Sequence, residues 1–318
     1  MEAKHCLVIG DINIDFAIHT DHYPEEGGEA LSKEADFRLG GSGCATAVCL
    51  EKAGLGTTLA SSVGMDVFAD FAMQHIRASG VDASLVQQLP AAQTGFFMIL
   101  VTATGQRTMF GNRGANAFPL NLDTLKTRLE QVDHLHISGY SMLSEESHAV
   151  VYTAAEYARD KGITISLDPG VCTSQQAGDR VLDFLPLVDW FLPSRDEITV
   201  LTNPAAKNST NNTGFVSDEE LETSVTEILS RGCSAVALKL GEDGSLYSDG
   251  KTTVNEPAIS DPSRAVWNTT CAGDSFNAGF LKGMLTGASP EEALRLGNRT
   301  AFNLITSPHG LMDLINRQ

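Results

Sequence analysis

The residues best suited to chemistry lie in the stretch 268–280, which reads NTTCAGDSFNAGF. Small residues run up to Asp274, and an apolar spacing typical of a helix begins at Phe276. The first N–H groups of a helix lack backbone partners and carry partial positive charge, so small residues there let an anion approach closely. Asp274 in this first turn has two interpretations. It either caps the helix, or it acts as a general base that takes a proton from a hydroxyl beside the bound anion.

A glycine-rich stretch, Gly40-Gly41-Ser42-Gly43, precedes a second helical pattern that runs to about residue 53. Such a stretch either cradles a phosphate or forms an ordinary tight turn. The dinucleotide fingerprint G-x-G-x-x-G is not met, because Thr46 stands in place of the last glycine, and the chain has no G-x-x-x-x-G-K-[S/T] phosphate loop. On its own this stretch is therefore a weak indication of phosphate binding.

The elements that must position these groups alternate between strand and helix from about residue 132 onward. Apolar, β-branched runs indicate buried strands, and serine capping boxes with acidic first turns indicate helix starts. The predicted strands are 134–138, 163–167, 190–192 and 235–240, and the predicted helices are 144–161, 196–201, 217–232 and one that begins at Ser289. This alternation predicts an α/β fold with a doubly wound, mainly parallel sheet and helices on both faces.

Two segments near the N-terminus lack long helices and predict a separate β lid. Residues 94–102 are β-branched and aromatic, and Thr104-Gly105 predicts a turn into a strand at 107–110. We expect a small antiparallel sheet that is inserted into the α/β body and covers it. The predicted lid comprises 12–38 and 93–116, and the predicted body comprises 1–11, 39–92 and 117–318.

Composition excludes several classes of protein. The chain has 318 residues, 40 acidic and 22 basic side chains, and a formal net charge of -18. Nucleic-acid binding and docking on anionic membranes both need basic surfaces, so we expect neither partner. No apolar run is long enough for a signal peptide or a membrane span, and the six cysteines contain no C-x-x-C pair, so we expect a cytoplasmic protein with free thiols. His134 and His136 share one face of a predicted strand without a third ligand, which favours core or edge positions over a metal site.

Five motifs, taken in order, resemble those of the ribokinase-like (PfkB) carbohydrate kinase family over nearly the whole chain. They are Gly10-Asp11-Ile12-Asn13-Ile14-Asp15, Gly40-Gly41, Pro193-Ser194-Arg195-Asp196-Glu197, Lys239-Leu240-Gly241-Glu242-Asp243-Gly244, and Ala272-Gly273-Asp274-Ser275-Phe276 with Ala278-Gly279-Phe280. Their common order and spacing is more specific than any one motif. The resemblance implies a ribokinase-like fold and transfer of a phosphoryl group from ATP, with Mg²⁺, to a sugar-type hydroxyl.

The resemblance also implies roles for the residues around the helix start. Asp274 would be the base, and the N–H groups of Ala272 and Gly273 would stabilise charge on the transferring phosphoryl group. Cys271 stands where the family has the first glycine of this turn. If the turn needs a positive φ there, cysteine would cost about 1–2 kcal/mol, whereas a negative φ would be tolerated.

Further residues are candidates for the binding sites that the resemblance implies, and of these Asp15, Gly40, Gly41, Gly241 and Gly244 match the family's residues. The acceptor positions are Asn13, Asp15, Gly40, Gly41, Ala45, Arg107 and Asn116. The nucleotide positions are Ser194, Lys239, Gly241, Gly244 and Asn298, and Glu197 matches the glutamate that acts on the magnesium shell. Lys239 either reaches phosphate or is a surface lysine, and Arg107 either meets an acidic acceptor or is a solvated lid residue.

The chain departs from the family pattern at several of these places. Ala45 and Ser42 stand where many ribokinases have Asn and Lys, which makes plain ribose a poorer acceptor. Ser194 and Gly170 stand where asparagine is expected. Asn268 replaces an aspartate that helps to hold a monovalent cation in many members, so we expect a weakened potassium site.

Together these observations predict an ATP-dependent kinase for a primary hydroxyl of a sugar or sugar acid. The first alternative is a nucleoside kinase of the same fold, with Phe16, Phe96, Phe97 or Phe110 of the lid as a stacking wall. The second is a catalytically silent regulator that binds a sugar or a nucleotide. Unpaired edge strands of the lid predict a homodimer formed through it.

Overall fold

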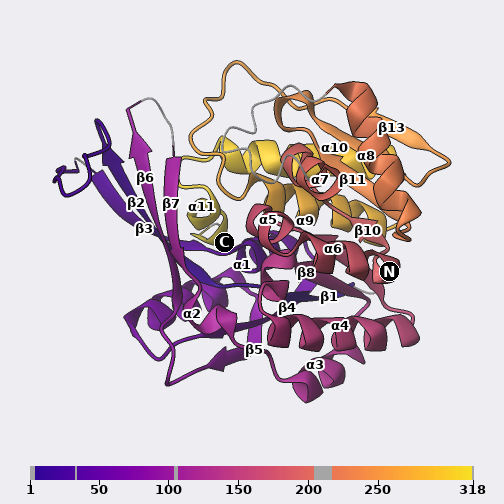
Figure 1. Ribbon diagram of the computed structural model, residues 1–318, viewed down its shortest axis with the longest axis horizontal. Helices are drawn as coiled ribbons and strands as arrows, with labels where there is room; N and C mark the ends of the chain where they lie inside the picture. Colours follow the sequence, from indigo (N-terminus) through magenta and orange to yellow (C-terminus); the bar gives the residue numbers. More distant parts are fainter. Residues whose placement is uncertain (1–3, 33, 104–106, 204–216, 317–318) are drawn as a thin grey trace.

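A computed structural model describes residues 4–32, 34–103, 107–203 and 217–316 of the chain. Its main body is built on one nine-stranded sheet in the order β13-β12-β11-β10-β9-β8-β1-β4-β5 (Figure 1). The seven strands from β11 to β5 in this order run parallel, and β12 and β13 continue the sheet as an antiparallel edge. The strands are β1 (His5–Ile9), β4 (Gly56–Val63), β5 (Asp82–Gln88), β8 (His134–Ser138), β9 (Thr164–Asp168), β10 (Trp190–Phe191), β11 (Ala235–Lys239), β12 (Ser245–Ser248) and β13 (Thr253–Glu256).

Helices cover both faces of this sheet, and a hydrophobic core fills each interface. Successive side chains of a strand point to opposite faces, so Leu7 and Ile9 of β1 enter one core while Cys6 and Val8 enter the other. The core with Cys6 includes side chains of α1 (Ser42–Lys52), α2 (Val67–Ser79), α9 (Ala272–Leu285), α10 (Pro290–Ile305) and α11 (Leu311–Asn316). The core with Leu7 includes side chains of α3 (Leu122–Leu129), α4 (Glu145–Asp160), α6 (Gly178–Phe184), α7 (Arg195–Thr202) and α8 (Asp218–Ser230), and the short α5 (Val171–Gln176) lies beside α7. The doubly wound fold class is confirmed.

Local sequence patterns account for several helix starts. Ser194, Ser217 and Ser289 each form a capping box with a glutamate three residues later, at the starts of α7, α8 and α10. Ser144 caps α4 in the same way with its hydroxyl alone. These ends were predicted within one or two residues, because the atoms that satisfy the first N–H groups are close in sequence.

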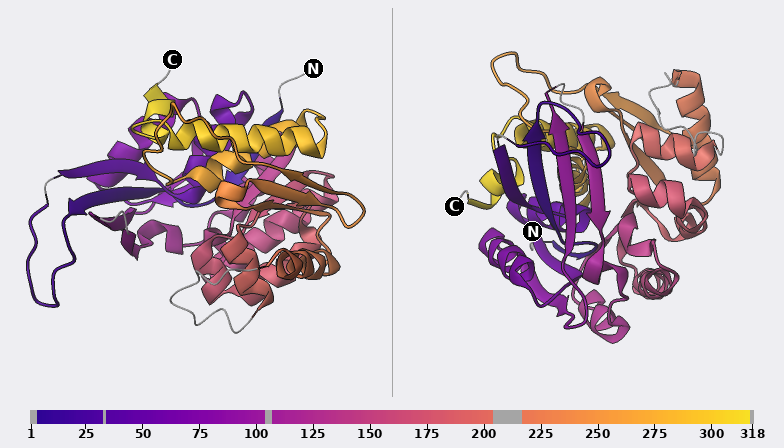
Figure 2. Two further views of the ribbon diagram at one scale, coloured as in Figure 1. Left: turned by 90° about the horizontal axis from the view of Figure 1, so that it is seen from above. Right: turned by 60° about the vertical axis from the view of Figure 1, so that its left-hand side comes forward.

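The lid is a separate four-stranded sheet that stands away from the body in Figures 1 and 2. Its order is β3-β2-β6-β7, from β2 (Asn13–Thr20), β3 (Glu34–Gly40), β6 (Gly95–Thr102) and β7 (Arg107–Asn112). The prediction of a wholly antiparallel lid was wrong, because β2 and β6 pair in parallel. Both strands leave the same end of the parallel main sheet, after β1 and after β5, and therefore enter the lid in the same direction. The predicted turn at Thr104-Gly105 lies outside the described residues.

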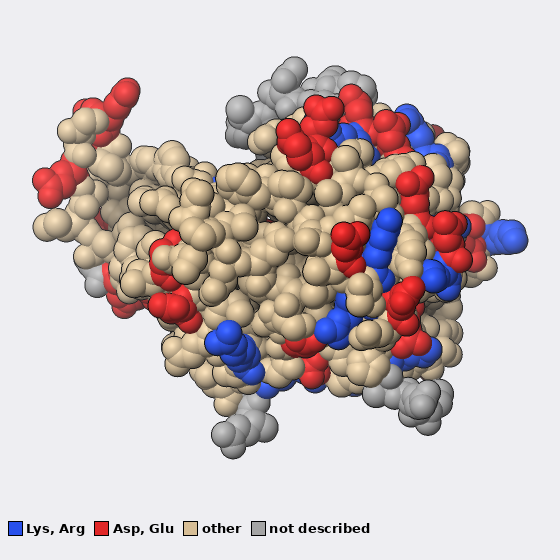
Figure 3. All heavy atoms as spheres, turned by 90° about the horizontal axis from the view of Figure 1, so that it is seen from below, with Lys and Arg blue, Asp and Glu red and all other residues tan. Residues whose placement is uncertain are grey.

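Acidic side chains are prominent on the surface, as the net charge of -18 requires. Figure 3 shows them at the tip of the protruding lid, where Glu25, Glu26 and Glu29 lie exposed between β2 and β3. On the body, at the right of this view, acidic and basic groups are interspersed. Among the described residues, no helix has the length and apolar character needed to cross a membrane.

Candidate active site

A cleft of about 830 Å³ opens at the carboxyl end of the parallel strands, against the start of α9. Open α/β sheets commonly bind ligands at this edge. The walls bring together Ser42 from α1, Asp168 at the end of β9, Lys239 at the end of β11 and Asp274 from α9. Residues that are far apart in the sequence therefore share one site.

The turn that starts α9 has a strained backbone. Cys271 precedes the helix with φ 61° and ψ 14°, and it is the one non-glycine residue with positive φ in the described part of the chain. The positive-φ alternative for Cys271 therefore applies, with its cost of about 1–2 kcal/mol. Strain of this kind is typically kept at functional sites.

Asp274 lies in the first turn of α9 and lines the cleft with Ala272 and Gly273. Its Oδ1 accepts a hydrogen bond from the Ser42 hydroxyl at 2.7 Å. Burial raises the pKa of Asp274 to about 7, and the nearby charge of Asp168 acts in the same direction. A carboxylate that titrates near neutrality can both accept and release a proton under ordinary conditions.

The backbone of the same turn supplies hydrogen-bond donors. The N–H of Ala272 reaches the carbonyl of Thr269 at 3.3 Å, which is a long bond. Over the described residues, the N–H groups of Gly273 and Asp274 have no backbone acceptor. Gly273 is thus the freer of the two donors that the sequence predicted, and an anion in the cleft can approach it.

Lys239 lies beneath this turn and forms a buried ion pair. Its Nζ donates to Oδ2 of Asp168 at 2.7 Å and to Oδ1 of Asn277 at 3.5 Å, and Nδ2 of Asn277 donates to the same Asp168 oxygen at 2.6 Å. A Cβ added to Gly273 would lie 3.4 Å from Nζ, so the ammonium group underlies the helix start. The alternative of a surface lysine was wrong, since the side chain of Lys239 is only 12% exposed.

Electrostatics keep this pair charged. Burial by itself lowers the pKa of Lys239, but the charges of Asp168 and Glu197 outweigh it and raise the pKa above its ordinary value. Burial by itself raises the pKa of Asp168, but Lys239 and the hydrogen bond from Asn277 outweigh it and lower the pKa. The two directions agree, and both groups are ionised at neutral pH.

Glu197 is buried at the start of α7, where it forms the capping box with Ser194. Its Oε2 accepts from the Ser194 N–H at 2.6 Å, and the Ser194 hydroxyl accepts from the Glu197 N–H at 3.3 Å. Burial raises the pKa of Glu197 to about 6, and Asp168 adds to this effect. The carboxylates of Glu197 and Asp168 both line the cleft. Two carboxylates fit a Mg²⁺ ion that is held mainly by phosphates and waters and has few protein contacts. The described residues contain no cluster of three or more metal-ligating side chains.

The far end of the cleft is lined by residues that the sequence analysis assigned to the nucleotide. Gly241 and Gly244 have φ of 66° and 99°, and a Cβ at Gly244 would lie 2.2 Å from the Glu256 carbonyl oxygen, so this turn needs glycine. The amide of Asn298 donates to the carbonyls of Glu256 at 3.2 Å and Pro257 at 3.0 Å, which fixes the backbone beside the cleft. An apolar wall able to contact a base is formed by Ala258, Val266, Phe276, Ala301, Phe302 and Ile305.

On the lid side, Asp15 of β2 lies next to Arg38 of β3 and Phe97 of β6 in the strand register. Burial raises the pKa of Asp15 to about 7, and Asp11 adds to the effect. A Cβ at Gly40 would lie 2.4 Å from the Asp15 carboxylate, so only glycine leaves room for it. The pKa of the Cys271 thiol is raised by burial and by the nearby charges of Asp274 and Asp15. The carboxylate of Asp15 on the lid and the expected base Asp274 therefore both lie near this thiol.

The strand register also limits which aromatic residue can face an acceptor. Phe97 shares a face with Asp15, whereas Phe16, Phe96 and Phe110 lie on the opposite face of the lid. Of the four rings predicted as a possible stacking wall, Phe97 alone shares the face of Asp15, and the wall itself stays a prediction. Successive side chains of a strand point to opposite faces of its sheet, and this alternation places Phe97 on one face and the other three rings on the other.

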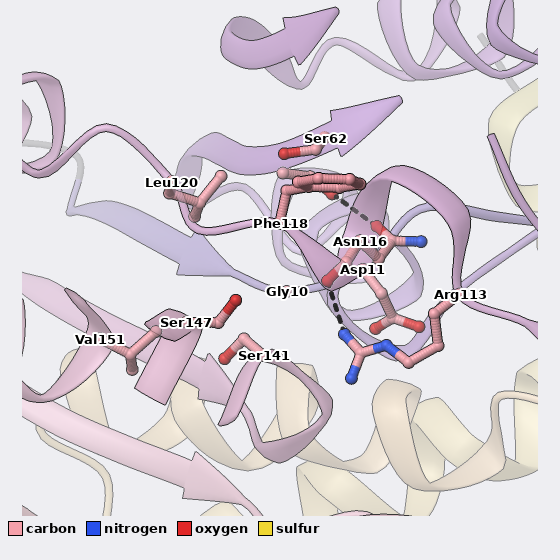
Figure 4. A pocket seen from close by; sticks show the side chains of 11 residues that line it. Gly10, Asp11, Ser62, Arg113, Asn116, Phe118, Leu120, Ser141, Ser147 and Val151 are labelled. Atoms are coloured by element: carbon pink, nitrogen blue, oxygen red, sulfur yellow. Dashed lines mark hydrogen bonds between the residues drawn. The ribbon is translucent and has the colours of Figure 1, made fainter. Parts of the chain in front are cut away.

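Several other predicted acceptor residues have structural contacts instead of an open position. The Asn116 amide donates to the Ile12 carbonyl at 2.8 Å and to Oδ1 of Asn13 at 3.0 Å, and Nδ2 of Asn13 donates to Asp11 at 2.6 Å. Figure 4 shows Asp11, Asn116 and Arg113 around a small pocket beside these hydrogen bonds. Ala45 is fully buried in α1.

Two further positions need glycine because of their backbone and close packing, and a third, Arg107, has a side chain that the structure does not describe. Gly41 precedes α1 with φ 96°, and a Cβ there would lie 2.4 Å from the Asp11 carbonyl oxygen. Gly170 has φ 69° and packs against the Tyr140 ring, which leaves no room for the asparagine of the family pattern. Arg107 begins β7, and its side chain lies outside the described part of the structure.

Sequence reasoning missed four residues of this site: Ser42 as a partner of Asp274, Asp168 and Asn277 as partners of Lys239, and Tyr140 in the cleft wall. Only Asp168 had a usable indication, since a carboxylate directly after a buried parallel strand lies at the ligand-binding edge.

Comparisons with known proteins identify the family and the fold. A model described as pfkB family carbohydrate kinase matches residues 3–313. A 2-dehydro-3-deoxygluconokinase of Dickeya dadantii is 28% identical over 331 aligned residues, which cover 96% of this chain and 96% of that protein. A ribokinase of Haemophilus influenzae is 24% identical over 317 residues, which cover 99% and 96%. The solved structure of Arabidopsis thaliana ribokinase complexed with ribose and ATP has the same fold, with a TM-score of 0.81 at 22% identity over 99% of this chain and 100% of that one.

Proposed function

The chain belongs to the pfkB family of carbohydrate kinases, and from this premise we propose that it transfers the γ-phosphoryl group of ATP to a primary hydroxyl of a sugar or sugar acid. The observation that carries the proposal is the place of Asp274, whose pKa burial raises to about 7, beside N–H groups of a helix start that have no backbone acceptor in the described part of the chain. A base and an anion site are thus joined in one turn. This pair is what phosphoryl transfer to an alcohol needs.

In the proposed reaction the acceptor hydroxyl gives its proton to the Asp274 carboxylate. The oxygen then forms a bond to the γ-phosphorus, and the bond from that phosphorus to the bridging oxygen breaks to leave ADP. The Gly273 N–H and the ammonium of Lys239 beneath it face the negative charge that develops on the phosphoryl oxygens. Glu197 and Asp168, which line the cleft, would hold the Mg²⁺ that accompanies ATP, and the ion would supply neutralisation of phosphate charge.

For the acceptor, Asp15 is the proposed hydroxyl-binding residue, because an ionised carboxylate accepts two hydroxyl hydrogens. The 2-dehydro-3-deoxygluconokinase and ribokinase relatives support a sugar or sugar acid. Phe97 next to Asp15 supports the second candidate, a nucleoside whose base would stack on this ring. Replacing Phe97 by Ala separates the two, since it should raise the KM of a nucleoside strongly and that of a sugar acid little.

The test is a coupled ADP-release assay with a panel of ketoses, pentoses, deoxy-keto sugar acids and nucleosides. We expect turnover with at least one member, and a loss of about 10²–10⁴ in kcat for Asp274→Asn with ATP binding by calorimetry largely intact. Normal turnover of Asp274→Asn would show that the base is wrongly assigned. Binding of ATP without ADP release from any acceptor would contradict the kinase proposal.

Monovalent cations are expected to have little effect. The side chain of Asn268 is neutral, and its oxygen already accepts the Thr270 N–H at 2.8 Å. We therefore propose that exchanging K⁺ for Na⁺ leaves kcat unchanged, and strong activation by K⁺ would contradict this.

The outer face of the lid supports a homodimer. Phe37, Met98 and Phe110 lie in one row across the strands, opposite to the face of Asp15, and are 52%, 36% and 56% exposed. A second copy of the lid would cover this row and the edges of β3 and β7. Light scattering should give a dimer for the native chain and a monomer for Phe110→Glu, and a native monomer at all concentrations would refute the proposed dimer.

The six cysteines carry free thiols, which supports the proposed cytoplasmic location.

A further inference from the structure

One hydrogen bond links the two helix starts that meet at the cleft. The hydroxyl of Ser42, the first residue of α1, donates to Oδ1 of Asp274 in the first turn of α9 across 232 positions of sequence. We infer that Ser42 is a positioning residue for the base: it holds Oδ1 of Asp274 so that Oδ2 is the oxygen left for the acceptor hydroxyl. The inference rests on the proposed function and deepens it.

The backbone explains why this hydroxyl is available. A serine at a helix start often caps its own helix, but here Gly41 is the cap residue, with φ 96°, and no side chain caps α1. The start of α1 is held tightly against the end of β1, since a Cβ at Gly43 would lie 2.5 Å from the Cα of Gly10. The Ser42 hydroxyl therefore has a fixed position and no local acceptor, and it reaches the carboxylate of α9.

The contacts of the carboxylate give the two oxygens different roles. Within the described residues, Ser42 is the one hydrogen-bond donor to Asp274, and Oδ2 has no partner. Both residues line the cleft. A carboxylate that is fixed through one oxygen loses little further freedom when an acceptor binds to the other, which favours a reactive geometry.

The charges around Asp274 do not replace this contact. The titratable and charged groups that face it are Asp11 after β1, Asp168 at the end of β9, Lys239 at the end of β11, Cys44 and Cys49 of α1, and Cys271 at the start of its own helix. Asp11 and Asp168 oppose ionisation of the base, and the ammonium of Lys239 is bonded to Asp168. Without Ser42, the ionised base would lose its hydrogen bond and keep the repulsion.

The first experiment compares pH profiles of kcat/KM for the native enzyme, Ser42→Ala and Ser42→Thr. The base works when it is ionised, so kcat/KM rises with pH through its pKa. For Ser42→Ala we expect this acid limb to move to higher pH by about one unit. The value of kcat/KM should then fall about tenfold at pH values below the limb and less at pH values above it. Ser42→Thr keeps the hydroxyl and should restore the native limb. Ser144→Ala, which removes a serine hydroxyl at the start of α4, is the matched control and should leave the limb in place.

A purely structural role predicts a different result, namely a loss by the same factor at every pH. That result, or an acid limb that does not move in Ser42→Ala, would overturn the inference. A native limb in Ser42→Thr together with a shifted limb in Ser42→Ala would support it.

A second measurement separates the inference from the proposed function. The carboxyl carbon of Asp274 is titrated by ¹³C NMR, with its resonance identified by its absence in Asp274→Asn. A raised pKa in Ser42→Ala supports the inference, and an unchanged one overturns it, whatever the turnover. If no acceptor is phosphorylated but the pKa still moves, the proposed function fails while the link between Ser42 and Asp274 stands.

Discussion

Asp274→Asn should make the protein more stable at alkaline pH while it slows turnover strongly. Asparagine keeps an oxygen that can accept the Ser42 hydroxyl bond, so the substitution removes the charge and preserves the shape and the contact. The side chain lies beside the buried carboxylate of Asp168, and both groups are ionised at high pH. The native protein therefore carries an electrostatic cost that the variant lacks.

The magnitude follows from the two pKa values of the group. Burial, helped by Asp168, raises the pKa of Asp274 from 3.8 to about 7 in the folded protein, while the unfolded chain keeps the ordinary value. Between these values the folded state binds more protons, so the free energy of unfolding falls as pH rises from about 4 to about 7 and stays low above that. Three pKa units correspond to a ceiling of about 4 kcal/mol, and contact of the side chain with the solvent in the cleft reduces the expected gain to about 1–3 kcal/mol.

The assay is urea unfolding of the native protein and of Asp274→Asn at pH 5 and at pH 8. The variant should gain stability at pH 8 and much less at pH 5, where the native carboxyl is mostly protonated. Asp160→Asn, an exposed residue at the end of α4, is the control and should show no such pH dependence. Equal stability of Asp274→Asn and native protein at pH 8, or an equal gain at both pH values, would refute the reasoning.

Three other substitutions test the strain, the ion pair and the acceptor side. Cys271→Gly should be more stable than Cys271→Ala by about 0.5–1 kcal/mol in urea unfolding, because glycine relieves the positive φ; the opposite order would exclude strain at this turn. Lys239→Met should lose about 3–5 kcal/mol because it leaves the Asp168 charge buried and unpaired, and adding Asp168→Asn should recover part of the loss in the same assay; additive losses would contradict the pairing. Gly40→Ala would put a Cβ 2.4 Å from the Asp15 carboxylate, so it should raise the acceptor KM far more than the ATP KM in steady-state kinetics; equal increases would argue against Asp15 as an acceptor residue.

Helix and strand positions in the body were predicted well because their causes are local. The strand at 134–138 coincides with β8, α8 and α10 begin directly after the serines of the predicted capping boxes, and α4 begins one residue after its predicted start. Each of these patterns involves residues within a few positions of one another, so it can be recognised in the sequence alone. The family resemblance, which rests on the order of five motifs, was likewise confirmed.

Features that depend on tertiary neighbours were not predicted. The parallel pairing of β2 with β6 depends on how two hairpins meet, which no local pattern specifies. The sequence left the φ of Cys271 open between two alternatives, and it gave no indication of the bond between Ser42 and Asp274, which joins helices that are far apart in sequence. The same holds for Lys239, which as a lone charged residue at a strand end looks like a surface residue until Asp168 is placed beside it.

The start of α9 collects several features that each reduce stability. Cys271 has a left-handed backbone, Asp274 is an acid whose ionised form is disfavoured by burial, and the pair of Lys239 and Asp168 is removed from water. Each costs free energy, since buried ion pairs seldom repay their desolvation and strained residues need support from their surroundings. A chain shaped only by stability would have glycine at 271 and an uncharged residue at 274. These costs meet around one turn, at the edge of the sheet where ligands bind, and this is an argument for catalysis there that is independent of any relative.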